Sequence, residues 1–167
     1  MTTALALPST EEEIWRYSRI NELDMSKFAN GKLTTTVEGG EGVQLTGAAA
    51  TALVGAGMHV QPDMFAQMNT DTPDVIALQI GKNKVHTQTV VITHSVDKSG
   101  VVAYPRLVID AAENSEIVVV ERFTSADNVH SLVVPVVEVH AAQSARVTYL
   151  AINELASAEI TRGQGQA

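Results

Sequence analysis

Histidine and carboxylate side chains are the residues in this sequence that could bind a metal ion or transfer protons. The histidines are His59, His86, His94, His130 and His140. No two of them are separated by a single residue, the spacing that places two imidazoles on one face of a strand. His86 and His94 lie on one face of an unbroken strand, but roughly 26 Å apart. We therefore expect no histidine metal site and interpret these residues as surface or corner side chains.

Four glutamates in the valine-rich part of the chain could form a carboxylate pair for acid-base chemistry. They are Glu113, Glu116, Glu121 and Glu138. Glycoside hydrolysis uses such a pair, so a carbohydrate-active or carbohydrate-binding β-helix protein is one hypothesis for the function. No spacing selects one pair among the four, and the plainer interpretation is a solvated outer face of strands. We expect no catalytic residue and no enzyme activity.

Composition excludes several classes of function. The chain has 167 residues, with 11 Lys and Arg against 19 Asp and Glu, a net charge of -8 and no cysteine. Without a basic run, binding to nucleic acid or to an anionic membrane is not expected. Without cysteine, the chain has no disulfide, no thiolate zinc site and no thiolate ligand for an iron-sulfur cluster, so we expect no cofactor bound by this chain alone. The first residues lack the pattern of a secretory signal, and no segment is long and apolar enough to span a bilayer, which favours a cytoplasmic protein.

The elements that must position these side chains fall into two kinds. Ser9 with Glu12 and Thr10 with Glu13 match the capping box, which predicts a helix from about Glu11 to just before Asn30. Residues 32–47 are rich in Thr and Gly and are expected to form a loop or a short hairpin. Short helices are expected at 48–54 and 62–69, where small and apolar residues stand beside glycine or proline. This first part, residues 1–73, is predicted to be a helical and mixed segment.

Beyond residue 73 the sequence changes to short β-branched runs separated by small-residue turns. Strands are predicted at 75–80, 87–96, 107–109, 117–123, 133–139 and 147–152. Residues 110–120 align with 140–150 at an offset of 30, and the same strand-corner-strand shape reaches back to 80–85. A fixed period made of strands predicts stacked coils, the start of a β-helix over 74–156; a β-sandwich with hairpins of similar length is the alternative. Residues 157–167 are predicted to be a polar tail.

Two segments resemble one known family. The string LPSTEEEIWRYSRINEL at 7–23 resembles the N-terminal signature of the SufB/SufD family, scaffold subunits of the SUF iron-sulfur cluster assembly system, and is most similar to the SufD branch. The strings VVAYPRLVI at 101–109 and SEIVVVERF at 115–123 are similar to the way that family enters its β-helical core. The two matches occur in the same order as in the family.

The resemblance implies a non-enzymatic scaffold that joins a SufB-type subunit and an ABC-type ATPase, SufC, on which an iron-sulfur cluster is assembled. Family members are usually longer, and their His- and Cys-bearing region lies in the later part, so no histidine of this chain is assigned a family role. The chain resembles the N-terminal half of a SufD-like protein, either a fragment or a short reading frame. A β-helix that ends after the strand at 147–152 leaves its last coil uncovered, so we also expect self-association, or binding of a partner, through that end.

Overall fold

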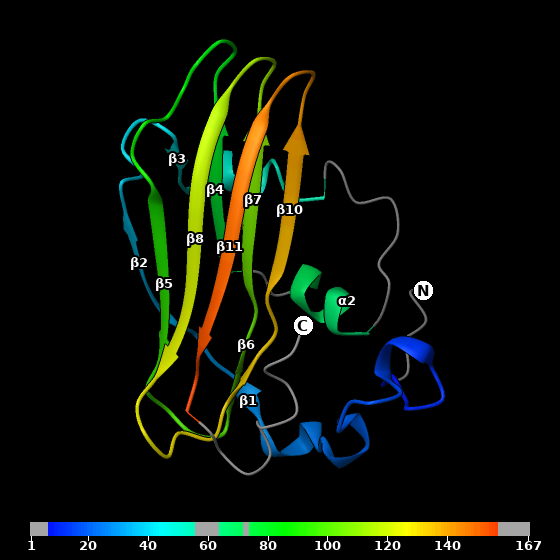
Figure 1. Cartoon of the computed structure of the whole chain (residues 1–167). Helices are drawn as coiled ribbons and strands as arrows, with labels where there is room; N and C mark the ends of the chain where they lie inside the picture. The colour runs from blue at the N-terminus through cyan, green and yellow to red at the C-terminus, as the bar shows by residue number, and fades with distance from the viewer. Residues whose placement is uncertain (1–6, 56–63, 72–73, 157–167) are drawn as a thin grey trace.

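A computed structural model describes residues 7–55, 64–71 and 74–156 of the chain (Figure 1). The strands are β1 (Ala29–Asn30), β2 (Thr34–Glu38), β3 (Gln44–Leu45), β4 (Asp74–Ile80), β5 (Val90–Val96), β6 (Val101–Ala103), β7 (Pro105–Ala111), β8 (Glu116–Ser125), β9 (Leu132–Val133), β10 (Val136–Ala141) and β11 (Arg146–Glu154). Two short α-helices are described, α1 (Gly47–Thr51) and α2 (Met64–Asp71), and three single 3-10 turns precede them at Glu13–Trp15, Ile20–Glu22 and Met25–Lys27. The mainly β class predicted from the sequence is confirmed.

The strands form three sheets. The first sheet has the order β11-β8-β5-β2, the second has the order β10-β7-β4-β3, and the third is the small sheet β1-β6-β9. In Figure 1, β8 and β11 lie in front of β4 and β7, and the third sheet lies below them. The apolar side chains that the first and second sheets turn toward each other form the largest core cluster, which includes Leu78, Ile92, Leu107, Ile109 and Val119.

Parallel pairing follows the repeat found in the sequence. Val136 of β10 pairs with Arg106 of β7, and Arg146 of β11 pairs with Glu116 of β8, both at an offset of 30 residues. The β4-β7 and β5-β8 ladders are also parallel, at offsets of 31 and 29 residues. At the small-residue corner that the repeat places at equivalent positions, Ala141 pairs with Ala111.

The β-helix predicted over 74–156 is not confirmed, and two strands from before that range join the sheets. β2 pairs with β5 and β3 pairs with β4 in antiparallel fashion, so the first and second sheets are mixed. The prediction of a loop or a short hairpin at 32–47 is therefore wrong. In β2, half-buried residues alternate with exposed ones, and β-branched residues in that pattern suit a strand that finds its partner far along the chain.

The helix predicted from about Glu11 to just before Asn30 is also wrong, because three 3-10 turns and the start of β1 form there. Helices gain most of their stability from an apolar face that is packed, and two large apolar side chains here, Ile14 and Tyr17, are exposed. The expected capping of Ser9 and Glu12 forms in part: the Ser9 backbone N donates to Glu12 Oε1 at 3.0 Å. Thr10 instead accepts a hydrogen bond from Asn21.

The other predicted elements agree with the structure to within a few residues, with one division. The run predicted at 133–139 is split into β9 and β10 by Val134 and Pro135, and proline lacks the N–H that a continuous ladder needs. The strand β6 was not predicted. The predicted helix at 62–69 starts outside the described residues. The predicted tail at 157–167 lies entirely outside them. Within the described ranges, no helix is long and apolar enough to cross a membrane.

Candidate functional site

Buried charged side chains gather at two places in the described structure. The first, the outer network, consists of Arg106 and Glu138 with their partners on the face of the second sheet that packs against the helices. The second, the inner network, consists of His94 and Glu121 with their partners on the inner face of the first sheet. All four side chains are buried, although charged residues are rarely buried unless paired.

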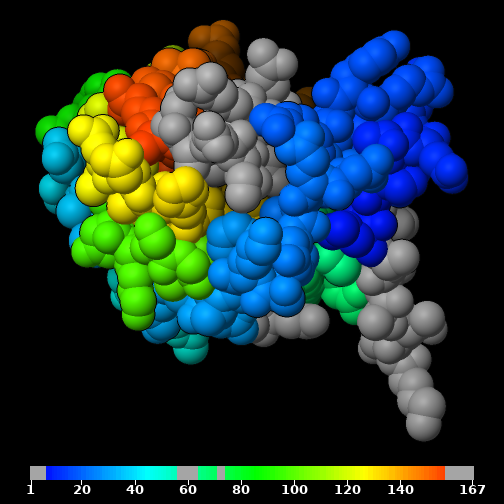
Figure 2. All heavy atoms as spheres, turned by 90° about the horizontal axis from the view of Figure 1, so that it is seen from below, coloured from blue at the N-terminus to red at the C-terminus, as the bar shows by residue number. Residues whose placement is uncertain are grey.

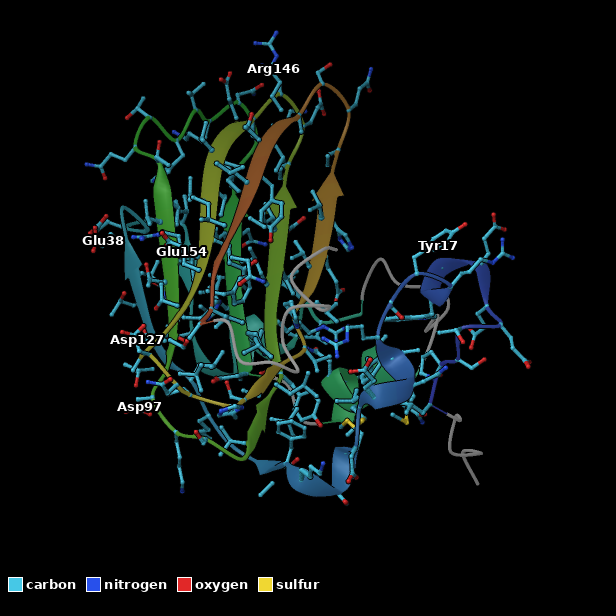
Figure 3. All side chains as sticks on the ribbon, turned by 60° about the horizontal axis from the view of Figure 1, so that its bottom comes forward. Tyr17, Glu38, Asp97, Asp127, Arg146 and Glu154 are labelled. Atoms are coloured by element: carbon cyan, nitrogen blue, oxygen red, sulfur yellow. The ribbon has the colours of Figure 1, made fainter. Side chains whose placement is uncertain are left out.

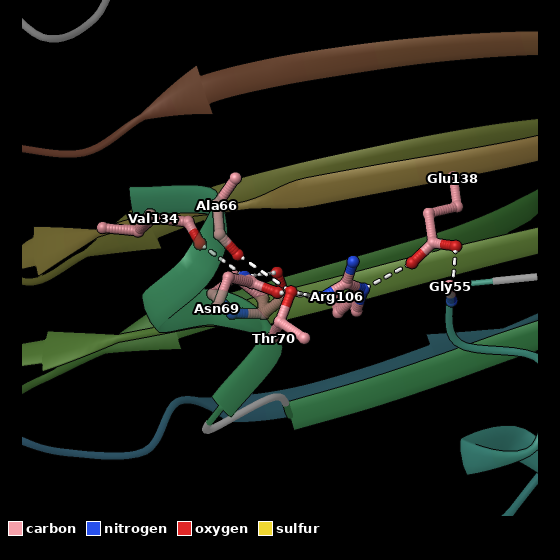
Figure 4. A network of polar contacts seen from close by, with 8 residues as sticks. Gly55, Ala66, Asn69, Thr70, Arg106, Val134 and Glu138 are labelled. Carbon is pink, nitrogen blue, oxygen red and sulfur yellow. Dashed lines mark hydrogen bonds and ion pairs between the residues drawn. The ribbon is translucent and has the colours of Figure 1, made fainter. Parts of the chain in front are cut away.

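The outer network is a buried ion pair with further donors and acceptors around it (Figure 4). Arg106 Nε donates to Glu138 Oε1 at 2.5 Å, and the backbone N of Gly55 donates to Glu138 Oε2 at 2.8 Å. Arg106 Nη1 donates to Asn69 Oδ1 and to Thr70 Oγ1, both at 3.1 Å. The guanidinium and the carboxylate thus compensate each other away from water, as a buried pair requires.

Asn69 extends this network to the backbone of β7 and of the link between β9 and β10. Its Nδ2 donates to the carbonyl of Pro105 at 2.9 Å and to the carbonyl of Val134 at 2.8 Å. Val134 lies between β9 and β10, where the run of strand residues is interrupted. The outer network therefore holds α2, Gly55 and this interruption together on the second sheet.

The inner network runs across the four strands of the first sheet in their spatial order, β2, β5, β8 and β11. Thr35 Oγ1 lies 2.9 Å from His94 Nδ1, and His94 Nε2 lies 2.9 Å from Glu121 Oε1. Tyr149 donates its hydroxyl to Glu121 Oε2 at 2.5 Å. The His94 ring stacks on Phe123 with a centroid distance of 5.1 Å. In a neutral His94, Nε2 donates to the carboxylate and Nδ1 accepts from the threonine hydroxyl.

The electrostatics of the inner network keep Tyr149 protonated. Burial raises the pKa of the Tyr149 phenol, and the hydrogen bond to Glu121 and the negative charge of that residue raise it further. The phenol is therefore a donor over the ordinary pH range. The hydroxyl of Tyr149 contacts one carboxylate oxygen of Glu121 and the imidazole of His94 contacts the other. Both oxygens are therefore engaged by residues of the same sheet.

The four glutamates singled out in the sequence lie in different surroundings. Glu113 pairs with Lys82 at 2.7 Å and Glu116 lies 3.6 Å from Arg146, and both carboxylates are partly exposed. The interpretation of a solvated outer face of strands is correct for Glu116, whereas Glu113 is solvated but lies in the turn before β8. It is wrong for Glu121 and Glu138, which are buried, because each has a partner that compensates for its lost hydration. Each of the four has its own separate partners.

The histidines are also separated. His86 Nε2 lies 2.7 Å from the carbonyl oxygen of Gly39, and His130 is exposed. His94 is 3 % exposed, so its interpretation as a surface or corner residue is wrong. His140 Nε2 is buried with no hydrogen-bond partner among the described residues. His59 lies outside the described residues. In that described part of the chain, no group of three or more His, Cys, Asp or Glu side chains could hold a metal ion.

Strand alternation in the sequence indicates that the residues of the inner network face the core, although their polar residue types suggest the surface. Glu121 stands at the same alternate positions of its strand as Ile117, Val119 and Phe123, and these positions face the core. His94 likewise alternates in phase with the buried valines and isoleucine of β5. No comparable signal marks Arg106 or Asn69, because their contact depends on where α2 packs on the sheet.

Comparison with known proteins identifies one matching family. The model for the SufBD core domain of SUF system FeS cluster assembly matches residues 76–166, which is more than half of the chain and includes the strands from β5 to β11. No curated protein sequence and no solved structure matches the chain. The family match covers the second of the two segments that resemble SufB and SufD, and both buried networks draw residues from it. On this match, the chain belongs to the SufBD core family of the SUF system for FeS cluster assembly.

Proposed function

We propose that this protein is a non-enzymatic scaffold component of the SUF system, acting together with a SufB-type subunit and a SufC-type ABC ATPase in the cytoplasm. The observation that carries the proposal is the match of the SufBD core domain to residues 76–166. The resemblance of residues 7–23 to the N-terminal signature of SufD supports it, because that segment lies outside the matched range. The ATP chemistry is assigned to the ATPase, and the iron-sulfur cluster is cargo assembled in the complex.

The polar groups of the core support a scaffold more than an enzyme. In the outer network, the Glu138 carboxylate is held by Arg106 and by the backbone N of Gly55. In the inner network, the Glu121 carboxylate is held by His94 and Tyr149. Groups engaged in this way are suited to fixing strands and helices in place. Because the chain has no cysteine, thiolate ligands for a cluster come from a partner in this proposal.

We also infer that the parallel part of the first and second sheets is a short stack of β-helical coils that presents the partner surfaces. Partners spaced 29 to 31 residues apart in the four long parallel ladders support this. The corners support it too: Asn83 and Asn114 both have positive φ, of 59° and 56°, and the Asn114 amide donates to the Asn83 side chain at 2.9 Å. Stacked asparagines in the left-handed region are a device for turning successive coils alike.

Co-purification tests the proposed function. The chain is co-expressed with the SufB-type subunit and the ATPase of the same organism, and the tagged ATPase is purified. A complex that contains the chain is expected, and its ATPase activity should differ from that of the ATPase alone. Recovery of a complex of the other two subunits without this chain, even when the chain is folded and in excess, would contradict the proposal.

A further inference from the structure

The N-terminal segment exposes two large apolar side chains. Ile14 is 88 % exposed and Tyr17 is 93 % exposed. Ile14 lies in the 3-10 turn Glu13–Trp15 and Tyr17 follows that turn by two residues, so the two exposed side chains are close together in the chain. Figure 3 shows Tyr17 on the N-terminal segment, which lies to one side of the sheets. Single exposed apolar residues are common, but neighbouring ones of this size mark an interaction surface more often.

The segment that carries these two side chains is anchored to the body. Trp15, which lies between them, packs against Phe65 of α2 with a ring centroid distance of 5.8 Å. Ile20 and Leu23 are buried in the same apolar cluster. The Ser18 hydroxyl donates to the carbonyl of Trp15 at 2.7 Å and helps to fix the turn. Figure 2, a view from below, shows the N-terminal residues in blue gathered on one side of the molecule. The exposed pair is therefore presented by a held segment.

Charge defines what can bind there. Glu11, Glu12 and Glu13 are all exposed and directly precede Ile14, whereas Arg16 is the single cation between Glu11 and Tyr17. A surface that combines two apolar anchors with three carboxylates complements an apolar pocket bordered by Lys or Arg. It repels an anionic bilayer, and it also repels a second copy of a chain whose net charge is -8.

We propose that Ile14, Tyr17 and the three preceding glutamates form a docking patch, hereafter the N-terminal patch, for another protein subunit of the SUF complex. The partner surface offers an apolar pocket with a basic rim. Ile14 and Tyr17 enter the pocket and supply most of the affinity, and the glutamates speed association and fix orientation. The proposal rests on the proposed function, and it adds to it the part of the chain that recognises the partner and the chemistry of that recognition.

Binding of the full chain to the purified SufB-type subunit and, separately, to the purified ATPase tests the patch. The variant Ile14→Ser/Tyr17→Ser removes the anchors, and Glu11→Gln/Glu12→Gln/Glu13→Gln removes the charge while keeping side-chain shape. Val85→Ser is the matched control, because Val85 is also exposed (61 %) but lies beside β8. Thermal unfolding of each variant shows whether the fold is kept, which the exposure of all five patch residues leads us to expect.

The anchor variant is expected to weaken binding to one of the two subunits by about tenfold or more, while Val85→Ser leaves it unchanged. The glutamine variant should lower the association rate at low salt and weaken its dependence on salt. Equal affinity of all folded variants for a subunit that binds the wild-type chain would overturn the patch and leave the proposed function intact. Failure of both subunits to bind the wild-type chain would overturn both.

Two other occupants of the N-terminal patch are measured in parallel. Flotation with zwitterionic and anionic lipid vesicles tests a membrane, and sedimentation of the chain alone tests a second copy. Vesicle binding or self-association that is lost in Ile14→Ser/Tyr17→Ser and kept in Val85→Ser would overturn the assignment to a protein subunit with a basic rim. The expected result is no patch-dependent binding in either measurement.

Discussion

Removing the cation of the outer network should destabilise the protein strongly. In Arg106→Met, the Glu138 carboxylate stays buried with the Gly55 backbone N as its remaining described donor, while Asn69 and Thr70 each lose a donor. Breaking a buried pair by removing one partner costs about 3 to 5 kcal/mol. That is a large fraction of the total free energy of unfolding, about 5 to 15 kcal/mol for an ordinary domain.

Urea denaturation followed by circular dichroism measures this loss, and an exposed pair supplies the control. Lys82 and Glu113 form an ion pair of nearly the same length, but both side chains are about half exposed, so Lys82→Met should cost about 0 to 1 kcal/mol. The double variant Arg106→Met/Glu138→Leu leaves no buried charge unpaired. It should therefore lose less free energy of unfolding than the sum of the two single variants, by about 0.5 to 3 kcal/mol.

Two results would refute this reasoning. If Arg106→Met cost no more than Lys82→Met, burial of the pair would be irrelevant to its contribution. If the losses of the two single variants simply added in the double variant, Arg106 and Glu138 would not be coupled. Where Arg106→Met is too unstable for urea titration, Arg106→Lys, which keeps the charge and loses the fork of donors, gives an intermediate loss to measure.

Three further predictions concern the inner network, a corner and the core. Tyr149→Phe should cost about 1 to 3 kcal/mol at neutral pH, because the buried Glu121 carboxylate loses a donor. Since the folded pKa of Tyr149 is raised above its ordinary value of 10.0, the free energy of unfolding should fall as the pH rises past about 10, and urea titrations at increasing pH should show a shallower fall in Tyr149→Phe. Asn114→Ala should cost about 1 to 2 kcal/mol in thermal unfolding because φ is 56° there, and Asn114→Gly less. Ile109→Ala in the core should cost about 2 to 5 kcal/mol by urea denaturation, and a loss below 1 kcal/mol would mean that the two sheets are not packed as described.

The sequence predicted the part of the fold that depends on local pattern and on repetition. Alternating β-branched runs located the long strands, and the 30-residue repeat predicted which residues would pair, as Ala111 with Ala141 shows. It did not predict β2 and β3, whose partners β5 and β4 lie far along the chain and run the opposite way. Those pairings depend on tertiary packing, and no local pattern records them.

The same distinction applies to the polar residues. Strand alternation could have placed Glu121 in the core, but reading carboxylates as surface groups concealed it. The outer network could not be predicted from the sequence, because it forms only when α2 packs Asn69 and Thr70 against Arg106. The N-terminal helix was predicted from its caps alone. Caps contribute about 1 kcal/mol each, and they do not hold a helix whose Ile14 and Tyr17 stay in water.

The central claim is that this chain contributes to FeS cluster assembly as part of the SUF system. The most direct test is the cluster content of a reporter iron-sulfur protein in cells depleted of this chain, measured by its visible absorbance and its iron content. We expect depletion to lower the cluster content without lowering the amount of reporter polypeptide, and the wild-type chain to restore it. An unchanged cluster content in depleted cells that rely on the SUF system would contradict the account.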